Sequence, residues 1–204
     1  MFEQTWWNSH AENKISEFKD WVGDEHAHSK RYIKFYLNRH AYKSFLDVGC
    51  GNATLYNPIK NYLKIEYTGV DSCKFFIDSG LKNGIHIIES DVRDMSCIHD
   101  SSYDFGFSRH VFEHQESFNP ALSELIRVSK HEACHIFFIK PADVKKISFD
   151  PAQKLYHNTY AKNDIDAYLK NNKKVVSWSW VSINDNEEAL HIILTDTETN
   201  NSIN

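Results

Sequence analysis

The residues best suited to chemistry in this sequence follow an apolar run from Phe45 to Val48, which ends in the turn Gly49-Cys50-Gly51. Glycines between a strand and a helix let the backbone adopt positive φ and approach a ligand closely. The free N–H groups of the helix that follows point toward whatever is bound. The segment therefore predicts a place that holds a cofactor.

Two carboxylates end the next two predicted strands. Asp71 lies about twenty residues beyond the glycines, where a carboxylate can accept both hydroxyls of a ribose. Asp91 ends the strand after that. Because open α/β sheets bind ligands at the carboxyl ends of their strands, the arrangement predicts a cofactor that contains adenosine.

The glycine pattern distinguishes two classes of cofactor. A nicotinamide dinucleotide requires G-x-G-x-x-G, whose third glycine lets helix and strand close over a pyrophosphate. The third position here is Thr54, so the dinucleotide fingerprint fails.

The elements that must position these residues alternate along the chain. The expected strands are 44–49, 66–71, 85–90, 103–108 and 133–140, and the expected helices lie near 53–63, 73–80 and 117–129. Such alternation is typical of an α/β fold with a doubly wound parallel sheet.

The C-terminal third follows a different pattern. After a helix over 162–171, two β-type runs cover 175–183 and 189–195. The segment between those runs is too short for a crossover helix, which predicts an antiparallel hairpin at the edge of the sheet.

One domain over residues 1–195 accounts for these elements. We expect 1–43, which carries two amphipathic helical patterns, to form an N-terminal helical lid, and 44–195 to form the core. The polar residues 196–204 predict a disordered tail.

Composition and net charge limit the classes of partner expected for this chain. With 204 residues, 41% hydrophobic, the chain suits a soluble globular domain, and its net charge of -5 gives no basic footprint for nucleic acid. No signal peptide precedes the first motif, and no window reaches the ~18 apolar residues of a membrane span, so we expect a cytoplasmic protein that does not bind membranes. The four cysteines are widely spaced, which predicts reduced thiols and no metal site.

The residues resemble the class I S-adenosylmethionine-dependent methyltransferases of the small-molecule branch. Asp47, Gly49 and Gly51 match the D-x-G-x-G of that family's first motif. The resemblance runs from Ser44 to about Pro141. It includes the segments 67–72 and 89–92 as second and third motifs, 103–114 as the fourth-strand signature and 122–130 as the helix that follows.

That resemblance implies a Rossmann-like seven-stranded sheet, S-adenosylmethionine as cofactor and methyl transfer to an oxygen or nitrogen of a small molecule. Asp47 would lie near the methionine part, Asp71 at the ribose and Asp91 at the adenine. The residues expected to bind the cofactor are Asp47, Gly49, Cys50, Gly51, Asp71, Ser72, Asp91, Val92, Ser108 and Arg109. Ala53 departs from the family, which often has a third glycine there, and it limits φ in the turn.

Histidines supply the candidates for acceptor chemistry. His110, His114 and His157 could each serve as general base, because an unperturbed imidazole titrates near neutrality. His157 and Tyr160 follow the fifth strand, in the loop 141–162 that we expect to complete the lid, and either bind the acceptor or pack. Residues 110–114 also match H-x-x-E-H, but they follow a buried strand directly, so we expect no metal.

Two other hypotheses stay open. One is a methyltransferase-like protein that binds the cofactor or a partner without turnover, and the other is a nicotinamide-dependent oxidoreductase. Methyltransferases that act on amino groups of nucleic acids or glutamine resemble each other in having an Asn or Asp followed by two prolines at this point. The segment 108–111 has no such sequence. Neither the acceptor nor the oligomeric state follows from the sequence.

Overall fold

The computed structural model describes residues 27–152 and 154–195. The first of the two expected N-terminal helical patterns, and the expected tail, lie outside these residues. Within the described part, no helix combines the length and apolar character needed to cross a membrane.

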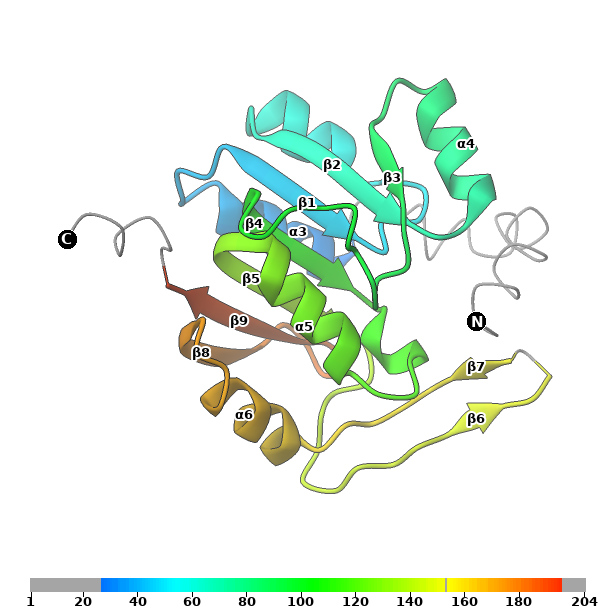
Figure 1. The fold of residues 1–204 in the computed structure, drawn as a ribbon, viewed down its shortest axis with the longest axis vertical. Coiled ribbons are helices and arrows are strands. Elements are labelled where there is room, and N and C mark those ends of the chain that lie inside the picture. Colours follow the sequence, from blue (N-terminus) through cyan, green and yellow to red (C-terminus); the bar gives the residue numbers. More distant parts are fainter. Residues whose placement is uncertain (1–26, 153, 196–204) are drawn as a thin grey trace.

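A seven-stranded sheet forms the centre of the molecule, in the order β3-β2-β1-β4-β5-β9-β8 (Figure 1). Its strands are β1 (Ser44–Val48), β2 (Glu66–Asp71), β3 (Ile87–Glu89), β4 (Tyr103–Arg109), β5 (Ser129–Phe137), β8 (Val175–Ser182) and β9 (Glu188–Leu194). The first five run parallel, whereas β9 is antiparallel to both β5 and β8. The predicted mostly parallel sheet with an antiparallel C-terminal hairpin at its edge is confirmed.

Helices cover both faces of the sheet (Figure 1). They are α3 (His28–Leu37), η1 (Asn57–Tyr62), α4 (Lys74–Lys82), η2 (Phe112–His114), α5 (Asn119–Val128) and α6 (Lys162–Lys170). On one face, residues of α5 and α6 share a buried apolar cluster with Leu46 and Val48 of β1. On the other, residues of α3 and η1 share a cluster with Phe45, because successive side chains of a strand point to opposite faces. Short, nearly continuous apolar strands are therefore buried on both sides, as the sequence predicts.

A buried carboxylate fixes α3 to its face of the sheet. The Tyr36 and Tyr42 hydroxyls donate to Glu132 on β5, at 2.8 and 2.5 Å, and His191 Nδ1 lies 2.6 Å from the same carboxylate. The Tyr32 hydroxyl lies 2.8 Å from the other ring nitrogen of His191. Three donors thus surround a carboxylate that would otherwise be costly to bury.

Two elements differ most from the ranges expected. The helix expected near 53–63 begins only at Asn57 and has π-type hydrogen bonding, because left-handed φ values at Gly51 and Ala53 keep the chain in turns first. The strand expected over 133–140 is β5, Ser129–Phe137. It ends earlier because the Phe138 N–H donates to the Glu113 carboxylate. A small hairpin, β6 (Phe149–Asp150) with β7 (Leu155–Tyr156), also forms inside the expected loop 141–162.

Candidate active site

The glycine turn wraps around the end of β1, at the carboxyl edge of the sheet. The N–H groups of Gly49 and Cys50 both donate to the carbonyl of Val70, at 2.8 and 3.0 Å. Gly49 has φ of +74°, and a Cβ there would lie 2.4 Å from a methyl group of Val111. Gly51 has φ of +53°, but a Cβ there would meet no atom within 4 Å. The turn is therefore crowded at its first glycine and open at its second.

Asp71 is joined directly to this turn. Its Oδ2 accepts from the Gly51 N–H at 2.8 Å, and its Oδ1 accepts from the Cys73 N–H at 2.8 Å. Burial raises the pKa of the Asp71 carboxyl, and these backbone donors oppose the rise. Ser72 lies partly buried beside it. The predicted ribose acceptor and the glycine turn thus form one hydrogen-bonded unit.

Asp47 comes just before the turn, on β1, and Cys50 lies within the turn. Asp47 is 5% exposed, and Tyr67 donates to it at 2.7 Å. Burial raises the pKa of Asp47 to about 6, against the opposing effects of the Tyr67 hydrogen bond and the charges of Arg109 and Lys30. The Cys50 thiol packs over Gly69, where a Cβ would lie 2.7 Å from the sulfur, and burial raises its pKa.

The third acid lies one strand further along. The Ser90 N–H donates to the carbonyl of Asp71 at 3.0 Å, which places Asp91 at the same edge. Asp91 forms an ion pair with Arg93, with Nη2 2.6 Å from Oδ2. Burial raises the pKa of Asp91, but hydrogen bonds from Arg93 outweigh burial and hold the pKa below its usual value. Val92 packs against the core on the α5 side.

A positively charged side chain, Arg109, lies at the end of β4. Burial lowers the pKa of Arg109, and the charges of the Asp47, Glu187 and Glu113 carboxylates oppose this shift. The neighbouring Ser108 is fully buried, and its Oγ has no hydrogen-bond partner among the described residues.

His110 follows in a left-handed conformation, with φ of +58°. Its Nε2 lies 2.9 Å from Glu187 Oε1, and its Nδ1 lies 3.3 Å from a guanidinium nitrogen of Arg109. Because guanidinium only donates, Nδ1 accepts and Nε2–H donates to Glu187. Burial lowers the pKa of His110, although Glu187 opposes this.

The other two candidate histidines lie together nearby. The rings of His110 and His114 lie on Phe138, with centroids 5.2 and 5.3 Å from its centroid. The His157 ring packs edge-on against His114 at 5.2 Å. The His114 Nδ1 lies 2.8 Å from the carbonyl oxygen of Tyr156. The structure therefore brings all three predicted histidines to one part of the edge.

Tyr160 is 3% exposed. Its hydroxyl lies 2.7 and 2.6 Å from the carbonyl oxygens of Phe112 and Gln115. It therefore supports the turn that carries His114. That turn is a single 3-10 turn rather than a long helix, and the described residues contain no group of His, Cys, Asp or Glu side chains suited to a metal ion.

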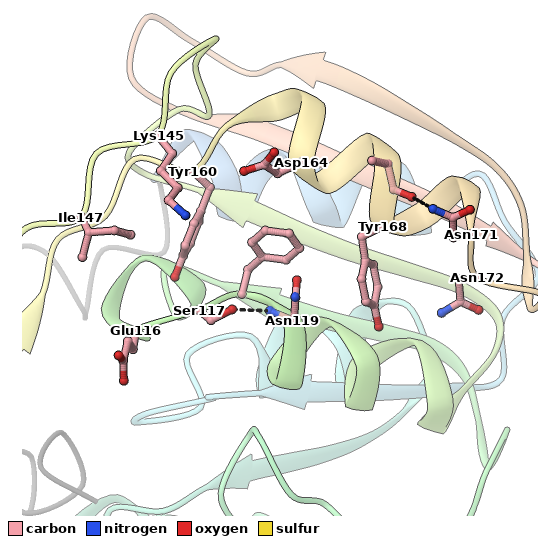
Figure 2. Close-up of a pocket in the computed structure, with 12 residues that line it drawn as sticks. Glu116, Ser117, Asn119, Lys145, Ile147, Tyr160, Asp164, Tyr168, Asn171 and Asn172 are labelled. Carbon is pink, nitrogen blue, oxygen red and sulfur yellow. Dashed lines mark hydrogen bonds between the residues drawn. The ribbon is translucent and has the colours of Figure 1, made fainter.

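A cavity of about 730 Å³ lies away from the glycine turn, between the start of α5 and helix α6 (Figure 2). Phe118 lines it, and Tyr160 and Tyr168 pack edge-on against the Phe118 ring, with centroid distances of 5.2 and 6.0 Å. Lys145, Asp164 and Asn119 line its rim (Figure 2).

Sequence reasoning missed the partners that come from distant segments. Lys30, 1% exposed on α3, lies near Asp47, and Glu187 lies in the β8–β9 turn. The antiparallel hairpin contained a signal for Glu187, because it returns that turn to the carboxyl edge of the sheet. No comparable signal marked Lys30.

Comparisons with known proteins agree with this geometry. Residues 46–137 match a family model described as a methyltransferase domain. No curated protein matches the sequence.

Two solved structures illustrate the similarity of fold. Magnesium protoporphyrin IX methyltransferase from Synechocystis PCC 6803, with bound SAM, is 14% identical with a TM-score of 0.66, and the match covers 95% of this chain and 97% of that one. A Burkholderia thailandensis 1,6-didemethyltoxoflavin-N1-methyltransferase, with bound 1,6-didemethyltoxoflavin and S-adenosylhomocysteine, is 15% identical with a TM-score of 0.65. That match covers 94% of this chain and 88% of the other. The predicted resemblance is confirmed, and at these identities the structures show the fold.

Proposed function

We propose that this protein, whose residues 46–137 match the model of a methyltransferase domain, uses S-adenosylmethionine to methylate an oxygen or nitrogen of a small molecule. The observation that carries the proposal is the hydrogen bond from the Gly51 N–H to Asp71. It joins the open glycine turn after β1 to a ribose acceptor at the end of β2. This pair lies next to the point between β1 and β4 where the strand order reverses, and such sheets bind ligands at that point.

The residues present fit this cofactor. The space beside Gly51 leaves room for the ligand, and the Asp71 carboxylate already faces that turn. The proposed contacts are Asp47, Gly49, Cys50 and Gly51 with the methionine part, Asp71 and Ser72 with the ribose, Asp91 and Val92 with the adenine, and Ser108 and Arg109 at the end of β4. Asp91 would contact adenine from within its ion pair with Arg93.

When bound, the cofactor supplies a methyl group activated by positively charged sulfur. The protein then has to align the acceptor with that methyl group and exclude water. A hydroxyl or amine acceptor must also lose a proton, and we propose that His110, His114 or His157 accepts it.

Small-molecule acceptors are supported by the Synechocystis and Burkholderia methyltransferases, whose named substrates are small molecules. We propose that the protein acts in the cytoplasm as one methyltransferase domain over residues 1–195. All four cysteines are free thiols, as predicted, which is typical of a reducing compartment.

Isothermal titration calorimetry tests the proposal. We expect wild-type protein to bind S-adenosylmethionine and S-adenosylhomocysteine but not NAD. Asp71→Ala removes hydrogen bonds to a charged group, worth about 1.5–3 kcal/mol, so affinity should fall about 10- to 150-fold. Asp78→Ala is the matched control, because Asp78 is exposed on α4 and pairs with Lys74.

The outcomes separate the hypotheses. Equal binding by Asp71→Ala and wild type, or no binding by either, would contradict the proposed site. Binding of NAD alone would indicate an oxidoreductase. Binding of S-adenosylmethionine with no methyl transfer to any acceptor would favour the non-catalytic protein.

A further inference from the structure

We propose that His114 is the general base of this protein, and that its Nε2 takes the proton from a hydroxyl or amine of the acceptor. This inference rests on the proposed methyl transfer and selects one of three candidate histidines. It also narrows the acceptor to groups that carry a proton until they react.

Hydrogen bonding fixes the tautomer of His114. Its Nδ1 lies 2.8 Å from the carbonyl oxygen of Tyr156, and a carbonyl oxygen can only accept, so Nδ1 carries the hydrogen. In a neutral ring, Nε2 then holds the lone pair. This nitrogen makes no hydrogen bond to any residue in the described part of the chain, and the side chain is only partly buried. A basic nitrogen with a defined orientation is therefore available.

The backbone on either side of His114 is held firmly. The buried Glu113 carboxylate accepts from the Phe138 N–H at 2.5 Å, and the Glu113 carbonyl accepts from the Asn158 N–H at 2.9 Å. The Tyr160 hydroxyl lies within 2.7 Å of the carbonyl oxygens of Phe112 and Gln115. A base must stay within hydrogen-bond reach of its proton, and these contacts give the ring a fixed support.

The other two histidines lack this combination. Both ring nitrogens of His110 are engaged, Nδ1 with Arg109 and Nε2 with Glu187. His157 has an edge-on ring contact with His114, but its ring makes no orienting hydrogen bond to any of the described residues. Only His114 among them has one nitrogen anchored and the other available, the arrangement of an oriented catalytic base.

The charge around His114 keeps its ring neutral before reaction. Burial lowers its pKa, and so does the neighbouring His157, whereas the Tyr156 carbonyl and the charge of Glu113 oppose the shift. The net direction is downward. The base is therefore unprotonated at neutral pH.

In the proposed methyl transfer, the acceptor's O–H or N–H bond breaks and its proton moves to Nε2 of His114. The electron pair of the acceptor oxygen or nitrogen forms a bond to the methyl carbon. The bond between methyl carbon and sulfur breaks with its electrons on sulfur, which yields S-adenosylhomocysteine. The imidazolium then releases its proton to solvent. A carboxylate or thiolate acceptor would need no such base.

Diethyl pyrocarbonate, which acylates neutral imidazoles, tests the inference when modified sites are located by mass spectrometry. We expect His114 to react, with its rate half-maximal below the ordinary imidazole value of about pH 6.5. Saturating S-adenosylhomocysteine should slow modification of His114, but not of His86, which is exposed near the start of β3.

His114→Asn is the informative variant, because the asparagine amide can still donate to the Tyr156 carbonyl while the basic nitrogen is lost. It should bind S-adenosylhomocysteine as wild type does. With any acceptor that wild type methylates, it should lower kcat about 10²- to 10⁴-fold, and His86→Asn should not.

The results distinguish the two proposals. If S-adenosylhomocysteine does not bind, the proposed function fails. If it binds but His114 is unreactive or unprotected, the assignment of the base fails and the proposed function stands. An acceptor that His114→Asn methylates at the wild-type rate would overturn the assignment as well.

Discussion

Substitution of the two glycines in the turn by alanine should have unequal effects on stability. Both have left-handed φ, where an L-residue costs about 1–2 kcal/mol. At Gly49 the added Cβ would also lie 2.4 Å from a methyl group of Val111, an overlap of the kind that costs about 1–3 kcal/mol in packed cores. At Gly51 it meets nothing within 4 Å. We therefore expect Gly49→Ala to lower the free energy of unfolding by about 2–5 kcal/mol and Gly51→Ala by about 1–2 kcal/mol.

The comparison isolates the steric clash. Any loss of unfolded-state entropy on replacing glycine by alanine is the same at both sites and cancels in the difference. Val111→Ala alone should cost about 1–2 kcal/mol of apolar packing, but it should partly rescue Gly49→Ala because it removes the clashing methyl groups. The assay is urea unfolding of the single and double variants. If the effects of Gly49→Ala and Val111→Ala add to within about 0.5 kcal/mol, the reasoning is wrong.

Three further variants test other parts of the structure. Ala53→Gly removes the strain of a left-handed alanine, which stabilises the fold, but it also removes a buried methyl group and raises the entropy of the unfolded chain, which both destabilise the fold. Its free energy of unfolding should therefore stay within about 1 kcal/mol of wild type in urea titrations. Asp47 has a raised pKa, so its contribution to stability is complete below its ordinary pKa of 3.8 and is lost as the pH rises through about 6. The unfolding free energies of wild type and Asp47→Asn should therefore diverge by about 3 kcal/mol between pH 3 and pH 7.5, and a constant difference would contradict this. Tyr42→Phe removes a donor from Glu132 and should cost about 1.5–3 kcal/mol in thermal or urea unfolding, whereas Tyr62→Phe, at an 82% exposed position, should cost little.

The sheet, and the meeting of the glycine turn with Asp71 at its carboxyl edge, could be predicted because their signals are local. A strand buried on both faces must be short and apolar, and a glycine after it marks a turn that only positive φ allows. The sequence therefore indicated that β1 ends at Gly49 and β2 at Asp71. The structure then joins these two ends through the hydrogen bond from Gly51.

The elements that were misplaced depend on partners distant in sequence. β5 ends at Phe137 because Glu113, on the loop after β4, accepts the next N–H group. The small β6–β7 hairpin has only two residues in each strand, too few for a periodic pattern to reveal. The role of Glu132 in anchoring α3 was also hidden, because its donors come from α3, the loop after it and β9.

The difference between local signals and partners distant in sequence also explains why the sequence left three histidines as candidates for the base. Residue type and position near β4 and β5 are local properties, and they are similar for His110, His114 and His157. What separates the rings is the partner of each nitrogen, supplied by Glu187 from the β8–β9 turn in one case and by the Tyr156 carbonyl in another. A carboxylate fixed on Nε2 of His110 leaves only Nδ1, which Arg109 occupies, whereas a carbonyl on Nδ1 of His114 leaves Nε2 available. The capacity to accept a proton is therefore a property of the tertiary structure, and it requires the turn after β4 and the chain near β7 to be assembled together.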